Sequence, residues 1–284
     1  MTRYAVLSMD LEDWYHLDYF QGIAPDRSAS MLDGLDVYLS LLERHSIQTT
    51  FFVLSELAAG LGDKLRNMAE GGHEIASHGV AHKRPLQMTI DEFASDLRQS
   101  KATLENVVQR PVEGFRAPCF SMDRARLDEV KKAGYAYDSS RIDFAGHPLY
   151  GSVDVSDFAT VIPGHGVLQG FHEFEVSTLP FMGRRVPVSG GGYLRIVPWV
   201  IMRPLIQSYI AGHPLYVLYI HPFELSRRAS PAQVTRLSYP QQLRFSLGRT
   251  SVVRKLDKLI GLLKRNGFSF TTFKELSHGS VRPG

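Results

Sequence analysis

Apolar and polar positions alternate in two different periods along the first half of the chain. Apolar residues typical of short buried strands fill five runs, over residues 4–9, 48–54, 73–77, 114–118 and 135–140. Between these runs the apolar residues recur every three or four positions, as expected of helices, at Leu32, Leu35, Leu39 and Leu42 and over residues 55–70, 89–108 and 123–133. Thr89 and Glu92 have the spacing of a capping box at the start of one of these helices. This alternation predicts a parallel sheet, either open or closed into a barrel.

The second half of the chain has a different pattern. Residues 142–192 form short runs rich in Gly, Pro and His and predict an irregular, β-rich insertion. The following residues predict a helix after SGGGYLR (189–195), a buried strand over 214–222, a helix over 251–265 and a last strand over 268–273. No repeat or linker divides the chain, so we expect one domain over residues 1–284, with residues 225–250 as a basic loop.

Composition and charge exclude some classes of protein. A chain of 284 residues, 44% hydrophobic and 21% charged, can bury a full core, and a net charge of +3 gives no reason to expect nucleic-acid binding. A single cysteine, Cys119, excludes an internal disulfide and a thiolate-rich zinc site. The first residues contain no apolar stretch typical of a signal peptide, and residues 193–210 carry two arginines and two prolines that make a poor membrane span. We therefore expect a cytoplasmic protein, or one whose export signal has been removed.

Polar side chains gather where the predicted strands end, which is where parallel α/β folds place their chemistry. Three carboxylates follow the first strand, a histidine follows the third, and other polar residues follow later strands: Asp10, Glu12, Asp13, His78, Arg116, Asp138 and His221. Three carboxylates within four residues repel one another unless a cation offsets their charge.

A metal site would explain this acidic cluster. His78 and His82 are four residues apart, so both imidazoles could bind one ion if the segment becomes helical after its strand. A carboxylate would be the third ligand, leaving a position for water. Asp10 and Glu12 share a strand face, whereas Asp13 would reach the same side only if the strand ended or bulged.

The motifs together resemble a known family. SMDLED, SHGVAH, GFRAPCF, YAYDSS and LYIHPFE occur in the order and approximate spacing of the NodB-type polysaccharide deacetylases, carbohydrate esterase family 4. In the second half, FEVSTLP, VPVSGGGYLR and IHPFE resemble the exosortase-associated branch of that family, found in exopolysaccharide clusters. The resemblance implies a distorted (β/α) barrel of about seven strands. It also implies metal-assisted hydrolysis of an N-acetyl, sometimes an O-acetyl, group on a sugar.

The resemblance also implies roles for single residues. Asp10 would be the general base and His221 the general acid, with Arg116 orienting the base through a bidentate contact. Asp138 would orient either His221 or the base. His78 and His82 match the metal ligands. The family usually has a second aspartate directly after the first, but here Leu11 takes that position, so the metal carboxylate is either Glu12 or Asp13.

Further residues are candidates for substrate binding. The resemblance places Pro118 and Phe120 along the groove, and a backbone N–H near Pro118 and Cys119 would help to stabilise the oxyanion. Trp14, Tyr15 and Tyr193 could stack on sugar rings.

We expect a divalent metal, with Zn²⁺ suited to two histidines and a carboxylate, and Co²⁺, Ni²⁺ or Mn²⁺ as alternatives. The expected substrate is a glycan containing N-acetylhexosamine, either a polymer or a lipid-linked intermediate at the cytoplasmic membrane face. A metal-free hydrolase of cyclic amides or ureides, of the allantoinase-like type, is an alternative that His78 and His82 disfavour. A non-catalytic carbohydrate-binding module is another, and it would have no use for Asp10, Arg116 and His221 together.

One stretch of the second half is strongly basic. No acidic residue occurs between Leu225 and Leu256, whereas seven basic residues do: Arg227, Arg228, Arg236, Arg244, Arg249, Arg254 and Lys255. Such a stretch is typical of a solvated surface. It is also compatible with contact to an anionic polymer, a lipid pyrophosphate or a membrane face.

Overall fold

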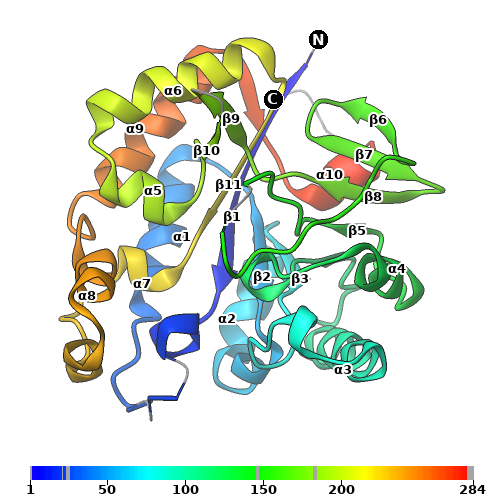
Figure 1. Cartoon of the computed structure of the whole chain (residues 1–284), viewed down its shortest axis with the longest axis horizontal. Helices are drawn as coiled ribbons and strands as arrows, with labels where there is room; N and C mark the ends of the chain where they lie inside the picture. Colours follow the sequence, from blue (N-terminus) through cyan, green and yellow to red (C-terminus); the bar gives the residue numbers. More distant parts are fainter. Residues whose placement is uncertain (1, 21, 24–25, 145–146, 182–183, 280–284) are drawn as a thin grey trace.

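A curled sheet with seven neighbouring parallel strands organises the molecule (Figure 1). The structure, a computed structural model, describes residues 2–20, 22–23, 26–144, 147–181 and 184–279. In spatial order the parallel strands are β11 (Leu215–Ile220), β1 (Arg3–Leu11), β2 (Thr50–Val53), β3 (Glu74–Ser77), β4 (Gly114–Phe115), β5 (Tyr137–Asp138) and β8 (Phe171–Phe174). The distorted (β/α) barrel of about seven parallel strands expected from the sequence is thus confirmed.

The curl brings the first strand of this order, β11, into contact with the residues that follow β8. The backbone N–H of Val217 in β11 donates a hydrogen bond of 2.9 Å to the hydroxyl of Ser177, which follows β8, and Ser177 N donates to Val217 O at 3.4 Å. β12 (Phe268–Phe270) runs parallel to the start of β1. Beyond β8 the sheet continues with two antiparallel strands, β7 (His165–Leu168) and β6 (Ala159–Ile162).

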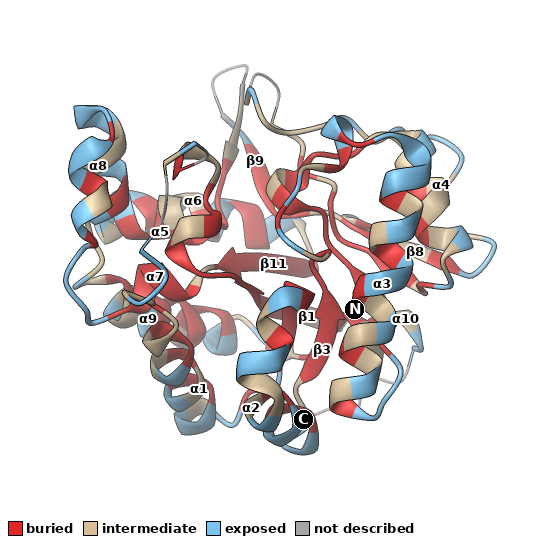
Figure 2. Ribbon diagram, turned by 90° about the horizontal axis from the view of Figure 1, so that it is seen from below, coloured by how far each residue is buried: buried red, intermediate tan, exposed pale blue. Residues whose placement is uncertain are grey.

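Most helices cover the outer face of the sheet (Figures 1 and 2), whereas the last one contributes Phe273 and Leu276 to the core inside it. Those between the early strands are α1 (Asp33–His45), α2 (Ala58–Glu70), α3 (Ile90–Val108) and α4 (Arg124–Lys132), and those of the second half are α5 (Gly191–Ile196), α6 (Trp199–Gly212), α7 (Pro222–Leu225), α8 (Tyr239–Ser246), α9 (Val252–Arg265) and α10 (Phe273–Ser277). The predicted capping box of Thr89 and Glu92 is present at the start of α3. No helix in the described ranges is both long and apolar enough to cross a bilayer.

β1 separates two cores because its side chains alternate between its faces. Ala5, Leu7 and Met9 lie in the larger core between the sheet and the helices. Val6 belongs to the core inside the curled sheet, and Ser8 and Asp10 continue on that inner face. The inner core holds Phe52, Tyr137, Phe174 and Val217 and is joined by Phe273 of α10. The functional site therefore lies on the inner face at the carboxyl ends of the strands.

Two expectations about the second half are wrong. Residues 142–192 are not an insertion throughout, because β8 is a strand of the parallel sheet, and the hairpin of β9 (Thr178–Phe181) and β10 (Arg184–Pro187) forms a separate sheet. The segment 225–250 is not a loop throughout, since half of it forms a 3₁₀ turn (Ala232–Arg236) and α8. The apolar side chains of this segment, Val234, Leu237 and Phe245, pack against Trp14 and Phe20.

Candidate active site

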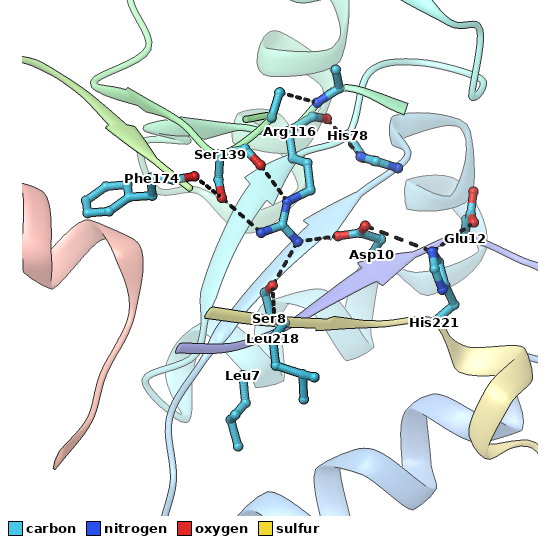
Figure 3. Close-up of polar contacts among 12 residues, drawn as sticks. Leu7, Ser8, Asp10, Glu12, His78, Arg116, Ser139, Phe174, Leu218 and His221 are labelled. Atoms are coloured by element: carbon cyan, nitrogen blue, oxygen red, sulfur yellow. Dashed lines mark hydrogen bonds and ion pairs between the residues drawn. The ribbon is translucent and has the colours of Figure 1, made fainter. Parts of the chain in front are cut away.

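The strand ends bring five of the predicted site residues into one place (Figure 3). Asp10 comes from the end of β1, His78 follows β3, Arg116 follows β4, and His221 follows β11. Glu12 comes one residue after β1, and its carboxylate lies 3.6 Å from Nε2 of His221. Because the strands are parallel and adjacent, residues far apart in the sequence share this edge.

Three residues form a cluster that could hold a metal ion: Glu12, His78 and His82. One ligand atom from each, all buried, lies within 4.8 Å of the others. His82 Nε2 lies 2.8 Å from the Glu12 carboxylate. Nδ1 of His78 is 2.8 Å from the carbonyl of Arg116, so its N–H is directed there and Nε2 is left available as a ligand. Nδ1 of His82 is buried and has no hydrogen-bond partner among the described residues.

The charges of this cluster fit a cation. Burial favours the neutral carboxyl of Glu12, but the neighbouring His82, His221 and His78 outweigh it and lower the pKa of Glu12 to about 2. Burial lowers the pKa of His78 to about 4, so its imidazole is neutral at neutral pH. An ionised carboxylate beside a neutral imidazole is the donor set that a divalent ion such as Zn²⁺ requires.

A loop, not a helix, brings the two histidines together. Residues 78–82 have no helical turn, contrary to the expectation from their spacing. Gly79 has φ of +84° and His82 has φ of +55°, and the two imidazole ring centres are 5.5 Å apart. The loop is held by Asp96 of α3, whose carboxylate accepts a hydrogen bond from Val80 N. A side chain at Gly79 would meet that carboxylate at 3.0 Å, which explains why glycine stands there.

Asp13 does not take part in the cluster, which answers the open choice between Glu12 and Asp13. Its carboxylate accepts hydrogen bonds of 2.8 Å from Trp14 N and 2.8 Å from Met31 N. It therefore caps the 3₁₀ turn Trp14–His16 and ties it to the loop before α1. The expectation that Asp13 binds the metal is wrong, because the chain leaves its strand after Leu11 and turns this side chain away.

Asp10 is paired with the fully buried Arg116. Nη1 of Arg116 lies 2.7 Å from Oδ1 of Asp10, a single contact where a bidentate one was expected. The other hydrogen bonds of the guanidinium hold it in place, with Ser8 Oγ at 2.8 Å, Ser139 O at 3.0 Å and Ser139 Oγ at 3.0 Å. Its carbon also lies 4.1 Å from the ring centre of Phe52. The arrangement offsets the charge of Asp10 and leaves its Oδ2 facing Nε2 of His221, 4.0 Å away.

A carboxylate that the sequence analysis did not identify orients His221. Oε2 of Glu224 lies 3.2 Å from Nδ1 of His221 and accepts from its backbone N–H at 3.1 Å. Oε1 of Glu224 accepts from Nε of Arg195 at 3.3 Å, and both of these side chains are buried. Burial disfavours a charged imidazole, yet the hydrogen bond to Glu224 and the charges of Glu12, Glu224 and Asp10 raise the pKa of His221 to about 9. His221 is therefore protonated at neutral pH and can act as an acid.

Asp138 has a different role from the one expected. Its two carboxylate oxygens accept hydrogen bonds from the backbone N–H of Ser140 at 2.7 Å and from its hydroxyl at 2.8 Å. Ser140 Oγ in turn accepts from Ala117 N at 2.8 Å. Asp138 thus holds the turn that follows Arg116. Both expected roles are wrong, because Glu224 orients His221 and Arg116 contacts the base, Asp10.

Two adjoining cavities open at the site. A cavity of about 120 Å³ is lined by Asp10, His221 and the metal cluster. Its other lining residues include Phe120, Tyr150 and Tyr219. A second, of about 370 Å³, shares His221 and Tyr219 with the first and continues past Tyr193 to Ile196 and Val197. Phe120 and Tyr193 therefore line the space where a substrate would lie, as expected.

Three of the expected substrate contacts are wrong. Trp14 is fully buried, packs against Phe20 with ring centres 4.9 Å apart and donates its indole N–H to Ala29 O, so it belongs to the core. Pro118 does not line either cavity; it is buried and begins the turn Pro118–Phe120, in which Cys119 and Phe120 have φ of +55° and +51°. Tyr15 lies edge-to-face with Trp14, has Arg27 over its ring and lines neither cavity.

Comparison with known proteins shows the family. Residues 33–137, which contain His78, His82 and Arg116, match the family described as Polysaccharide deacetylase, and residues 139–278 match a domain of unknown function. Residues 33–137 of this chain thus belong to the polysaccharide deacetylase family. It is 22% identical over 117 residues to the peptidoglycan deacetylase of Helicobacter pylori, and 26% identical over 132 residues to a peptidoglycan deacetylase-like protein of Gibberella zeae. These matches cover 41% and 46% of the chain, and 40% and 37% of the respective relatives.

Solved structures support the fold over the whole chain. A putative polysaccharide deacetylase from Mycobacterium smegmatis superimposes with a TM-score of 0.60 at 17% identity, covering all of this chain and 95% of the other. A family pseudoenzyme from Bacillus anthracis superimposes with a TM-score of 0.54 at 13% identity, covering 97% of this chain and 66% of the other. Because the fold occurs in a pseudoenzyme too, the activity has to be argued from the site residues.

Proposed function

We propose that this protein is a divalent-metal-dependent hydrolase that removes N-acetyl groups from N-acetylhexosamine units of a poly- or oligosaccharide. The observation that carries the proposal is the grouping of a His₂–Glu cluster, Asp10 with its buried partner Arg116, and His221 at one small cavity. Similar proteins point to the same substrate class, since one solved structure with a TM-score of 0.50 is a peptidoglycan N-acetylglucosamine deacetylase. The motifs of the second half make an exopolysaccharide or its lipid-linked precursor the natural substrate within this proposal.

Glu12, His78 and His82 would hold the metal, and Zn²⁺ suits their two nitrogens and one oxygen. When bound, a divalent cation supplies Lewis acidity towards the acetamide carbonyl and the attacking water.

Asp10 and His221 supply the proton transfers. Oδ2 of Asp10 is free of the contact that Arg116 makes with Oδ1, so it is the atom that accepts the proton of the attacking water. His221 faces Asp10 from the other side of the site and is protonated at neutral pH. Its Nε2–H donates the proton that the departing amine needs, because an unprotonated amine is a very poor leaving group.

The turn after Arg116 supplies a donor for the developing oxyanion. Phe120 N donates to Ala117 O and Ser121 N to Pro118 O, whereas the N–H of Cys119 has no acceptor among the described residues. Cys119 also lines the smaller cavity beside His78 and His82. An unused backbone N–H at this position is suited to bind the oxygen of a tetrahedral intermediate.

The proposal is tested by measuring bound metal and acetate release together. The wild-type chain, the His78→Ala/His82→Ala double variant and a control double variant, His45→Ala/His278→Ala, are loaded with Zn²⁺ and dialysed, and their metal content is determined by elemental analysis. Acetate release from chitin oligomers and from N-acetylated peptidoglycan fragments is followed in parallel. We expect about one ion per chain in the wild type and the control, and none in the double variant, with acetate released only where the ion is bound.

Other outcomes would refute the proposal in different ways. A wild type that binds no metal yet releases acetate would contradict the metal-dependent mechanism. Metal-free protein that binds the oligomers without releasing acetate would instead indicate a carbohydrate-binding module.

A further inference from the structure

The positive charge of this protein is concentrated in one part of the chain. Residues 176–256 contain eleven Lys and Arg residues but a single acidic one, a net charge of +10, whereas the rest of the chain carries −7. The single acidic residue is Glu224, which is buried against Arg195. Every exposed formal charge that the structure describes in this part of the chain is therefore positive.

Exposed apolar side chains are concentrated in the same part. Six of the nine large apolar residues found exposed in the described ranges lie between residues 196 and 247: Ile196, Val200, Ile201, Tyr239, Leu243 and Leu247. We call these six residues the apolar rim. Val200 is 78% exposed and Tyr239 is 75% exposed, so little of either side chain is covered by the described residues. Contiguous exposed apolar residues on a protein surface usually mark an interaction site.

α8 shows that this exposure follows a pattern. Tyr239, Leu243 and Leu247 are spaced by four residues and so lie along one face of the helix and its end. Phe245 points the other way and is fully buried among Trp14, Phe20 and Phe223. The helix is thus apolar on a side that the core does not use.

The two segments of the apolar rim lie at the same end of the molecule. Arg195 donates hydrogen bonds to the carbonyls of Arg244, at 2.6 Å, and Phe245, at 3.1 Å, which joins the end of α5 to the end of α8. Both views of the ribbon place α5, the start of α6 and α8 on one side (Figures 1 and 2). Four exposed arginines lie in these segments or close to them in sequence and form no ion pair with any described residue: Arg203, Arg236, Arg244 and Arg254.

We propose that the apolar rim and the surrounding arginines dock the protein on an anionic lipid bilayer. Apolar side chains that insert at the level of the headgroups, flanked by basic residues, are the usual means of interfacial membrane binding. A second copy of the chain is a poorer partner for this surface, because a symmetric dimer would bring two positively charged faces together. Zwitterionic and anionic lipids have the same hydrocarbon chains, so the apolar rim does not distinguish between them. The arginines favour the anionic lipids, because only these carry a net negative charge.

Docking of this surface would place the catalytic cavity at the bilayer. The larger cavity begins at His221 and Tyr219 and reaches Ile196, which belongs to the apolar rim. A glycan held near the headgroups could therefore enter the cavity without leaving the membrane surface. Membrane binding itself does not depend on the proposed activity.

The test is flotation of the full chain with liposomes of pure phosphatidylcholine and of phosphatidylcholine containing 30% phosphatidylglycerol. The apolar variant is Val200→Ser/Leu243→Gln and the charge variant is Arg203→Glu/Arg236→Glu. The matched controls change residues exposed elsewhere, Val161→Ser/Leu86→Gln and Arg44→Glu/Arg98→Glu. None of these residues belongs to the proposed catalytic machinery.

We expect the wild type and the controls to float with the anionic vesicles. The apolar variant should lose roughly tenfold or more in partition coefficient. In the charge variant each of the two reversals should lower the partition coefficient by about fivefold or more. Binding of the wild type should weaken as the salt concentration rises.

A wild type that does not float with anionic vesicles would overturn the proposal, as would apolar and charge variants that float as well as the controls. Sedimentation of the same proteins in solution tests whether the partner is a second copy of the chain. If the wild type forms a dimer that the apolar variant does not form, and does not bind vesicles, the surface joins two copies.

Discussion

Replacing Arg195 by Leu should destabilise the protein strongly, because Arg195 is the buried cation that balances Glu224 behind the catalytic histidine. Both side chains are at most 2% exposed. The guanidinium also donates to the carbonyls of Arg244, Phe245 and Leu247, which would lose a donor in the variant. Removing one partner of a buried ion pair costs about 3–5 kcal/mol, since the other charge stays buried.

Thermal unfolding and urea denaturation measure this loss. For a chain of this size each kcal/mol corresponds to about 2–4 °C in Tm, so we expect a decrease on the order of 10 °C. The Arg195→Lys variant should lose less, because it keeps the charge, but a lysine does not reproduce the several directed donors of a guanidinium.

A matched control separates burial from the mere presence of an ion pair. Arg124 also contacts two carboxylates, Asp128 and Asp157, but at the surface, with about a third of its side chain exposed. Arg124→Leu should therefore cost about 1 kcal/mol or less. The reasoning would be refuted if Arg195→Leu lost no more stability than Arg124→Leu.

Three further predictions concern the site. Glu224→Gln should move the alkaline limb of the pH–rate profile to lower pH, because the pKa of His221, now about 9, falls when the carboxylate is removed; an unchanged limb would mean that Glu224 does not tune the acid. Asp13→Ala should lower the free energy of unfolding by about 1–2 kcal/mol while metal content stays at the wild-type level, since Asp13 caps a turn; loss of metal would contradict this. Gly79→Ala should reduce metal affinity measured by competition with a chelator, because at φ of +84° the new methyl group strains the loop between the two histidines; unchanged affinity would show that the loop tolerates it.

Local patterns were sufficient to predict most of the elements and the composition of the site. The apolar run of β1 and the three- and four-residue spacing of α3 depend on neighbours in the sequence, so they can be recognised without the fold. The same holds for the position of Asp10 and His221 at strand ends, because parallel sheets place their chemistry there. The pattern HPFE contained a further signal, since His221 followed three residues later by Glu224 has the spacing of a capping box.

The sequence by itself determined the parallel (β/α) architecture and the residues that meet at the strand ends. The spacing of apolar residues and the alternation of strands and helices along the chain depend only on neighbouring positions. Only the tertiary structure decided which carboxylate joins His78 and His82. Glu12 and Asp13 are neighbours just beyond the strand, but Glu12 is directed into the site and Asp13 caps a turn. It also decided that Trp14 is part of the core and that Arg195 supports Glu224 across 29 residues of sequence. Such contacts depend on how distant segments pack, and no pattern along a single strand or helix specifies them.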